Sequence, residues 1–537
     1  MFEVLKNPGS KIQSDHYRMP YHPLGNGFVD RENELRRLHD ILVKGKNAVV
    51  EDVGMVIGTG GIGKTQLAIE YVYSYASDYP GGIFWIDAEL GLPVMISQIS
   101  EAAELPIDTT RETGDQLHDV WAHLNRCGPA LLVLDNFPDD DPLDPWLPTT
   151  PVVHVLVTTR RRDLASYSRI PLDFMTLKEG TELLNKGERR FGEDTDELVK
   201  TLGGLPLALK LARNHLNVRR ELTVADLIKE IAAKGENAAL ESYAKLYTNE
   251  LSSEHIKEIA TVFQISYEHA SDFAKRVLQV LAFLAPVPVP RRLLKKIFAK
   301  EVGKNGDDYL ADALDELCNT RALAEYDQDK DPLPHRLVAG FVREITKDKK
   351  QVCNRIDAAL NDEMHRIEDE GDTAVYRDLE KVEPHAAFAT ESGRIDAETI
   401  IDLLTMLMRY NQQKGLYRLA KAYGQKALST SETTLEPDHP SIAIRQSNLA
   451  MVLRSLGELN EARDLLRKAL ATWEKAFEPG HSSIAIRQSN LALVLKDLGE
   501  IEEARDLLRK ACQTFLNKFG DDHPYTKIVK RNIDSLG

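Results

Sequence analysis

A repeat with a period of 42 residues near the C-terminus constrains the fold of this 537-residue chain more than any other feature. The segment IAIRQSN occurs at Ile442–Asn448 and again at Ile484–Asn490, and EARDLLRKA occurs at Glu461–Ala469 and again at Glu503–Ala511. Other residues keep the same spacing, namely His439, His481 and His523, and an earlier, weaker copy at Gly415, Ala420, Ala427 and Leu428. Identical blocks at one offset predict an array of stacked structural repeats.

Each repeat contains two helical patterns that flank a Leu-Gly-Glu turn. Small residues occupy the positions where the two helices must touch, and leucines occupy the other interior positions: Ala450, Ala462 and Ala469, with Leu449, Leu453 and Leu466. The glycine in each turn breaks the pattern and excludes a coiled coil. Residues 397–537 resemble tetratricopeptide repeats in the longer form of kinesin light chains, as three repeats and a closing helix.

The repeats also carry a candidate partner-binding surface. In a tetratricopeptide superhelix the first helix of each repeat lines the concave face. Arg445 and Asn448 lie three residues apart on that helix, and Arg487 and Asn490 repeat them one unit later. Asn can donate to and accept from a peptide backbone, and Arg offers a fork to a carboxylate. We expect a protein or peptide partner with an extended acidic segment; the alternative is duplication without function.

The middle of the chain predicts an α/β fold with a phosphate-binding loop. Short apolar runs at 53–57, 82–86, 130–134 and 153–157 alternate with helical patterns, as in a buried parallel sheet. The first run is followed by the pattern G-x-x-x-x-G-K-T and then by a helical pattern. Glycine lets backbone N–H groups approach phosphates, Lys64 neutralises them, and the Thr65 hydroxyl faces Mg²⁺. The candidate residues of this loop are Gly58, Gly60, Gly61, Ile62, Gly63, Lys64, Thr65 and Gln66.

Two further strand ends complete the expected site. Asp135 ends an apolar run, which predicts a carboxylate beside the metal ion that Thr65 holds, so Thr65 and Asp135 are the candidate Mg²⁺ ligands. Lys64 and Asp135 are the candidate catalytic residues. Asn136 follows where many hydrolytic P-loop enzymes have a second acid, so we expect at most a slow ATPase. Arg160 ends the next run and is expected to contact the γ-phosphate.

Together these motifs resemble the NB-ARC family of STAND signal-transduction NTPases over residues 24–345. The resemblance rests on the loop at 58–65, the strand at 131–135, Thr158–Arg160, Gly204–Ala208, Phe28–Glu32 and Leu333–Val338. It implies that Val29 and Arg31 contact adenine, that Pro206 packs on adenine, and that His335 touches the β-phosphate of ADP. Departures from the family pattern are Asp30, Asn136 and Arg336.

The resemblance implies a multidomain chain. We expect a short segment at 1–23, a P-loop nucleotide-binding domain at 24–170, a helical domain at 171–255 and a winged helix at 256–350. A helical connector at 351–396 and the tetratricopeptide α-solenoid at 397–537 follow. The first 23 residues are too few to bury a core, so no N-terminal effector domain is expected. The implied function is an ADP/ATP-controlled switch that senses a partner through its repeats, forms a homo-oligomer with ATP and acts on an effector protein in trans.

Composition and charge disfavour several classes of function. The formal net charge of −16 disfavours binding of nucleic acid by the whole chain. Four widely spaced cysteines indicate no disulfide framework, and the absence of a signal peptide or an 18-residue apolar run predicts a cytoplasmic protein without a membrane span. Two alternatives remain. A winged-helix DNA-binding regulator is suggested by the basic cluster at 291–300 but opposed by acidic residues at 307–316, and a metabolic ATPase or kinase lacks a substrate motif.

Overall fold

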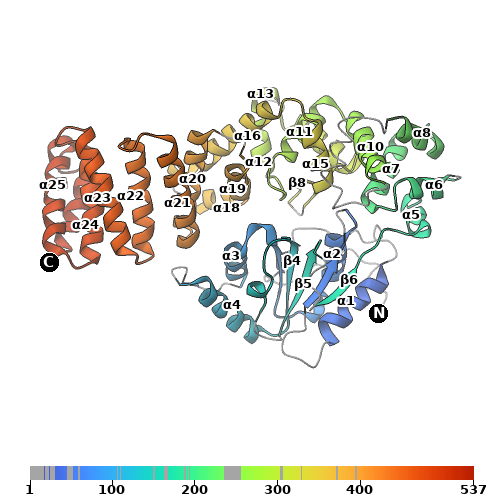
Figure 1. Ribbon diagram of the computed structural model, residues 1–537, viewed down its shortest axis with the longest axis horizontal. Helices are drawn as coiled ribbons and strands as arrows, with labels where there is room; N and C mark the ends of the chain where they lie inside the picture. Colours follow the sequence, from blue (N-terminus) through green and yellow to red (C-terminus); the bar gives the residue numbers. More distant parts are fainter. Residues whose placement is uncertain are drawn as a thin grey trace. The chain divides into compact units, whose positions relative to one another are not determined.

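The computed structural model describes the chain except residues 1–16, 19–22, 24–30, 45–52, 59–60, 104, 106, 109–110, 149–151, 162–166, 187–188, 193, 235–254, 303–305, 328, 370–372, 394–395 and 537 (Figure 1). The chain forms two compact units, one with residues 1–107 and 113–356 and the other with residues 108–112 and 357–537. No helix in the described ranges is long and apolar enough to cross a membrane. The expected domain boundaries within the first unit stay predictions.

A parallel sheet forms the base of the first unit. Its strands are β1 (Tyr17–Arg18), β2 (Val53–Ile57), β3 (Ile83–Asp87), β4 (Ala130–Phe137), β5 (Val153–Thr159) and β6 (Ser168–Pro171), in the order β1-β3-β4-β5-β2-β6. All described pairings within this sheet are parallel, which confirms the fold class expected from the apolar runs. Because β5 lies between β2 and β4, the end of β5 adjoins both the phosphate-binding loop and Asp135.

Helices cover both faces of this sheet. Helices α3 (Leu92–Ala102) and α4 (Thr113–Cys127) contribute Met95, Ile99 and Trp121 to a core with alternate residues of the strands. The opposite strand residues face α1 (Glu32–Lys44) and α2 (Lys64–Tyr75). A Cβ on Gly54 would lie 2.9 Å from Leu38 of α1, so β2 and α1 approach closely there.

The rest of the first unit is mainly helical. Helices α5 (Leu177–Leu184), α6 (Thr195–Thr201), α7 (Pro206–Val218) and α8 (Val224–Lys234) precede α10 (Ile256–Glu268) and α11 (Asp272–Ala282). Then come α12 (Arg291–Ile297), α13 (Ala299–Val302), α14 (Gly306–Asp315) and a π-helical turn (Glu316–Thr320). An antiparallel hairpin of β7 (Ala324–Tyr326) and β8 (Pro332–Pro334) leads into α15 (Arg336–Ile345) and α16 (Lys349–Met364).

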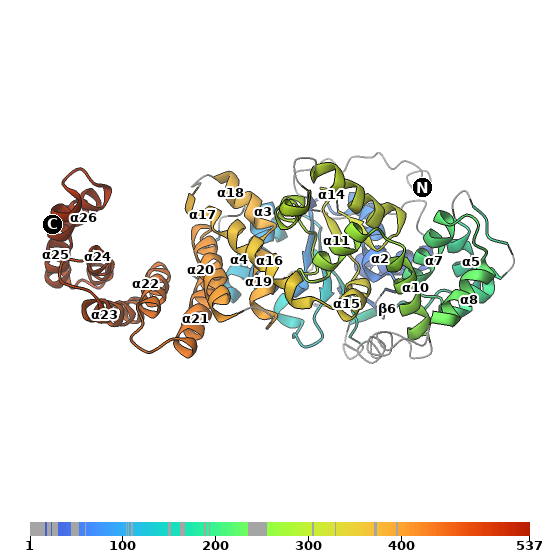
Figure 2. The ribbon, with the colours of Figure 1, turned by 90° about the horizontal axis from the view of Figure 1, so that it is seen from above.

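Paired helices form most of the second unit. Helices α17 (Arg366–Asp369), α18 (Thr373–Glu380) and α19 (Glu383–Glu391) precede three pairs: α20 (Ala397–Gln413) with α21 (Tyr417–Thr434), α22 (Pro440–Ser455) with α23 (Leu459–Ala476), and α24 (Ser482–Asp497) with α25 (Ile501–Phe519). Helix α26 (Pro524–Asp534) closes the array (Figure 2). Ala450, Ala462 and Ala469 are fully buried, which confirms their expected place between helices.

Candidate functional site

The phosphate-binding loop has the backbone shape that its glycines predict. Gly61 and Gly63 have φ angles of 74° and 98°, a left-handed conformation that glycine adopts without steric cost. Helix α2 begins directly after Gly63, at Lys64, so its first N–H groups face the loop. The ammonium of Lys64 donates a hydrogen bond of 2.8 Å to the carbonyl of Gly58. Gly60 and Val29, two further candidate residues, lie outside the described residues.

Asp135 meets Thr65 as the sequence predicts. The Thr65 hydroxyl donates to Asp135 Oδ1 over 3.0 Å, and the Thr158 hydroxyl of β5 donates to the same oxygen over 2.5 Å. Burial raises the pKa of Asp135, while the hydrogen bonds from Thr158 and Thr65 oppose that rise. The pair of a hydroxyl and a carboxylate at the start of α2 is the donor set that a hard cation such as Mg²⁺ takes.

The backbone conformation at position 136 gives a structural reason for an asparagine there, which the sequence did not reveal. Its φ angle is 56°, at a register shift between β4 and β5, and Asn tolerates this left-handed conformation better than most residues. Its backbone N–H donates to the Thr158 hydroxyl over 3.0 Å. The turn therefore ties the end of β4 to β5 beside Asp135.

The loop packs directly against the helical part of the unit. A Cβ on Gly61 would lie 3.1 Å from Leu337 of α15 and 3.5 Å from Leu205 and Leu207 at the start of α7. The backbone of Met175 approaches Gly204 even more closely, since a Cβ at position 204 would lie 2.2 Å from the carbonyl oxygen of Met175. Only glycine fits there. This contact brings Pro206, the first residue of α7, next to Met175.

These elements enclose a pocket of about 280 Å³. The candidate residues that line it are Arg31, Gly61, Ile62, Gly63, Lys64, Thr65, Gln66, Asp135, Arg160, Pro206 and His335. Gly58 is not among the lining residues, although its carbonyl accepts from Lys64. Residues separated by up to three hundred positions in the sequence thus share one cavity, and all of them belong to the first unit.

One part of the pocket is largely apolar and includes a buried cation. Arg31 is 8% exposed, and its Nη2 donates to the carbonyl of Asp173 over 3.0 Å. Its Nη1 is buried and has no hydrogen-bond partner among the described residues. Met175, Leu183 and Leu207 line the pocket as well. An apolar wall with one directed donor suits a planar heterocycle with an acceptor at its edge.

His335 caps α15 and faces the pocket. Its Nδ1 accepts from the Leu337 N–H over 3.2 Å, so in the neutral ring the proton is on Nε2. Burial lowers the pKa of His335 to about 4, which keeps the ring neutral at pH 7. His335 therefore combines a structural role, as a helix cap, with a place in the pocket wall.

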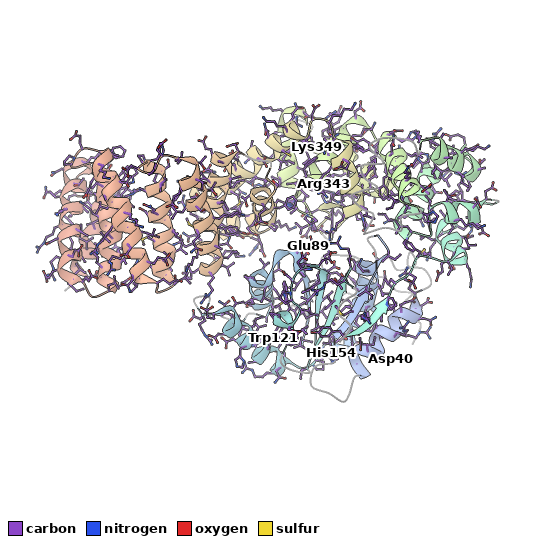
Figure 3. All side chains as sticks on the ribbon, viewed as in Figure 1. Asp40, Glu89, Trp121, His154, Arg343 and Lys349 are labelled. Atoms are coloured by element: carbon purple, nitrogen blue, oxygen red, sulfur yellow. The ribbon has the colours of Figure 1, made fainter. Side chains whose placement is uncertain are left out.

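Two charged side chains beside the pocket make ion pairs. Arg336 pairs with Glu89 over 2.7 Å, and Arg160 pairs with Asp139 over 3.2 Å. Glu89 follows β3 and lies at the carboxyl-end edge of the sheet, whereas His154, at the start of β5, lies at the opposite edge (Figure 3). Arg336, a departure from the family pattern, thus has an acidic partner of its own.

Sequence reasoning missed several lining residues, among them Met175, Leu183, Lys210 and Glu325. The sequence could have predicted Lys210 as a lining residue, because it lies four residues after Pro206 and hence on the same face of α7. Met175 and Leu183 belong to no motif, and only the close approach at Gly204 brings Met175 into the wall.

The candidate partner-binding residues lie in the second unit on α22 and α24 and are half-buried: Arg445, Asn448, Arg487 and Asn490. The guanidinium of Arg487 lies 4.5 Å from the centre of the Trp473 ring. Arg487 therefore makes a packing contact within the repeats. The Nε atoms of Arg445 and Arg487 are buried without a hydrogen-bond partner among the described residues.

Comparison with known proteins matches residues 409–475 and 445–517 to a family model described as tetratricopeptide repeat. The C-terminal helix pairs are tetratricopeptide repeats. The "Regulatory protein AfsR" of Streptomyces griseus is 29% identical over 218 residues, which are 38% of this chain and 22% of that protein. A "Nucleotide-binding leucine-rich repeat (NLR)-like protein" of Hyaloscypha variabilis is 24% identical over 477 residues, which are 79% of this chain and 46% of that protein.

A solved structure similar to this chain is that of a Signal Transduction ATPase with Numerous Domains (STAND) protein with a tetratricopeptide repeat sensor from Pyrococcus horikoshii. The match covers 95% of this chain and 88% of that chain, with 15% identity and a TM-score of 0.42. The chain spans less than half the length of each of the two curated relatives. The expected tetratricopeptide repeats are confirmed by the repeat match, and the expected resemblance to nucleotide-binding proteins agrees with the NLR-like relative.

Proposed function

We propose that the chain is a signalling NTPase whose first unit is controlled by ADP and ATP and whose repeats bind a protein partner. The observation that carries this proposal is the composition of the pocket wall. The phosphate-binding loop, Pro206 of α7 and His335 at α15 line the same cavity, so one occupant touches all three. A change of the bound nucleotide would therefore alter the contacts of all three elements.

The residues present fit a nucleoside phosphate with Mg²⁺. Gly61 and Gly63 leave room for phosphate oxygens, and Lys64 supplies a point charge to them. Thr65 and Asp135 would hold Mg²⁺, which neutralises phosphate charge when it is bound. The unpartnered Nη1 of Arg31 would donate to the base, and the Nε2–H of His335 would donate to a phosphate oxygen.

In this proposal the chain hydrolyses bound ATP slowly. Asp135 accepts from two hydroxyls and is suited to metal binding rather than to proton abstraction. Asn136 is an amide and does not take a proton from water. The chain therefore acts as a switch that holds its nucleotide, with ATP turnover as a reset.

The repeats serve as the sensor in this proposal. Arg445 and Arg487 each have a buried Nε without a hydrogen-bond partner among the described residues, and Asn448 and Asn490 follow one turn later on the same helices. These groups favour an extended acidic segment of a partner protein. The effector is a separate protein, and the ATP-bound form assembles with other copies of the chain.

Sedimentation of ADP-loaded and ATP-loaded protein tests the switch. We expect the chain to be a monomer with ADP and to form a larger species with ATP and Mg²⁺. The Lys64→Ala variant is the control and should not change its mass with either nucleotide. Equal masses of the wild-type protein with ADP and with ATP would contradict the proposal.

A second candidate, a DNA-binding regulator, rests on the basic residues of α12, which include Arg291, Arg292, Lys295 and Lys296. Against it, α14 carries Asp312 and Asp315, and carboxylates repel phosphate backbones. Salt-dependent retention of the purified chain on duplex DNA would favour the regulator over the switch.

A further inference from the structure

An ion pair crosses the wall of the pocket, away from the phosphate-binding loop. Lys210 of α7 and Glu325 of β7 both line the pocket, and the Lys210 ammonium donates a hydrogen bond to Glu325 Oε1. Lys210 lies one helical turn after Pro206, so both residues project from the same face of α7. The pair joins two elements that are more than a hundred residues apart in the sequence.

Glu325 is an unexpected residue in this place. Lys64 and the start of α2 make the pocket attractive to anions, whereas a carboxylate in the wall repels them. The side chain of Glu325 is 60% exposed and is reached from the pocket. Lys210 lowers the pKa of Glu325 from its usual value, so the carboxylate is charged at neutral pH.

The charges of the pair reach the centre of the site. Glu325 raises the pKa of His335, against the dominant effect of burial, whereas Lys64 and Lys210 both lower it. Glu325, Lys64 and Lys210 therefore all lie close enough to act electrostatically on His335, as Arg336 does. A phosphate chain held by Lys64 and His335 would therefore interact electrostatically with Lys210 and Glu325 as well.

We propose that Lys210 binds the phosphate chain of the nucleotide and that Glu325 competes with the phosphates for this ammonium. The proposal rests on the proposed function and deepens it. A phosphate chain draws Lys210 toward itself and weakens its contact with Glu325, so nucleotide binding opposes the contact between α7 and β7. ATP carries more charge than ADP and therefore weakens this contact more strongly.

Two substitutions at this pair have effects of opposite sign. Lys210→Met removes the phosphate-binding ammonium and leaves the charge of Glu325 unopposed, so both nucleotides should bind more weakly. The expected loss is about tenfold or more, as for a hydrogen bond between charged groups. Glu325→Gln removes the competitor and should strengthen binding about threefold or more, a modest electrostatic gain in a partly solvated site.

The measurement is the dissociation constant of fluorescent ADP and ATP by anisotropy, for the wild-type chain and each variant. Lys234→Met is the matched control, because Lys234 of α8 also forms an ion pair, with Glu268, but does not line the pocket. Its affinity should equal that of the wild-type chain. The double variant Lys210→Met/Glu325→Gln should bind more tightly than Lys210→Met alone, since it no longer carries an unpaired carboxylate.

Wild-type affinity in Lys210→Met, or weaker binding in Glu325→Gln, would overturn the role of the pair while leaving the proposed function intact. Failure of the wild-type chain to bind either nucleotide would overturn both. If Lys210→Met does not fold, as judged by circular dichroism, the Glu325→Gln result decides alone. The melting temperature without nucleotide gives a second readout, since either single substitution breaks the ion pair and should lower it.

Discussion

At the scale of single residues, His335 combines the cap of α15 with a place in the wall of the pocket. Its Nδ1 accepts from the backbone of α15, which leaves Nε2–H as the donor that the pocket can use. The neutral state is imposed by burial, which lowers the pKa of His335 to about 4. A lysine or arginine in this place would bring a fixed charge, whereas the neutral ring brings only a directed hydrogen bond.

We predict that His335→Ala and His335→Ser both release ADP faster than the wild-type chain, while ATP binding changes less. Serine restores the helix cap but does not reach into the pocket, so only His335→Ala should also lose about 1 kcal/mol of stability. Stopped-flow release of fluorescent ADP and urea unfolding separate the two effects. ADP release at the wild-type rate in both variants would limit His335 to its structural role.

His215, a buried histidine of α7, makes stability depend on pH. His215 of α7 is 3% exposed, neither of its ring nitrogens has a described hydrogen-bond partner, and the centre of its ring lies 5.1 Å from that of His269. Burial, with a smaller effect of His269, lowers its pKa to about 4. The unfolded chain therefore binds a proton on this residue at a higher pH than the folded chain does.

The contribution of His215 to the free energy of unfolding should accordingly be constant above about pH 6.5, the ordinary pKa of histidine, and fall as the pH drops toward 4. His215 contributes on the order of 3 kcal/mol to this fall. His215→Leu should reduce the slope, whereas His118→Leu, at an exposed position of α4, should leave it unchanged. Urea unfolding at several pH values measures it, and an equal slope in His215→Leu and the wild-type chain would contradict the assignment.

The turnover of ATP is also decided by single residues. With Asn136 beside Asp135, we predict hydrolysis at about 10⁻⁴ to 10⁻³ per second, as in P-loop switches that lack their activating groups. Release of labelled phosphate under single-turnover conditions measures the rate, with Lys64→Ala as the blank. A rate above about one per second, far outside this intrinsic range, would show that another group activates the water.

At the scale of elements, the three histidines that keep the repeat spacing have a common task. His439 and His481 precede the first helix of a repeat and His523 precedes the closing helix α26, and in each case Nδ1 accepts from the backbone N–H two residues later. The rings of His481 and His523 also stack on Phe477 and Phe519. The sequence showed the spacing but gave no reason for it, which only the helix caps supply.

We predict that His481→Ala lowers the stability of the repeats by about 1 kcal/mol, the usual loss when a helix cap is removed. His481→Asp should retain most of the stability, because Asp is a good cap and is favoured by the helix dipole. The urea midpoint of the full chain, followed by circular dichroism, gives the comparison. Equal midpoints for His481→Ala and the wild-type chain would show that the cap is dispensable.

Periodicity predicted most elements, because it reports burial directly. The run at 53–57 is strand β2 to the residue, and the paired helices of the repeats were expected. Strands β1 and β6 were missed, since β1 has two residues and β6 is an edge strand with mostly exposed side chains. The sequence motifs identified the residues of the phosphate-binding loop. Met175, Leu183 and Glu325 line the pocket through tertiary contacts that no local pattern encodes.

At the scale of the whole molecule, the first unit holds the pocket and the second holds the repeats. A switch between two states requires an occupant that prefers one of them. A change from 1% to 99% of one state takes about 5.5 kcal/mol of differential binding. The extra phosphate and its Mg²⁺, the Lys210–Glu325 competition and a repeat-bound partner are the contributions that this chain offers.

Isothermal titration of ADP with Mg²⁺ into the nucleotide-free chain measures nucleotide binding by the pocket, with Lys64→Ala as the paired variant. The proposed nucleotide switch requires a single saturable site in the wild-type chain and no measurable binding in Lys64→Ala, while circular dichroism should show that the variant keeps its helical repeats. No saturable binding of ADP to the wild-type chain, or equal affinity in Lys64→Ala, would contradict it.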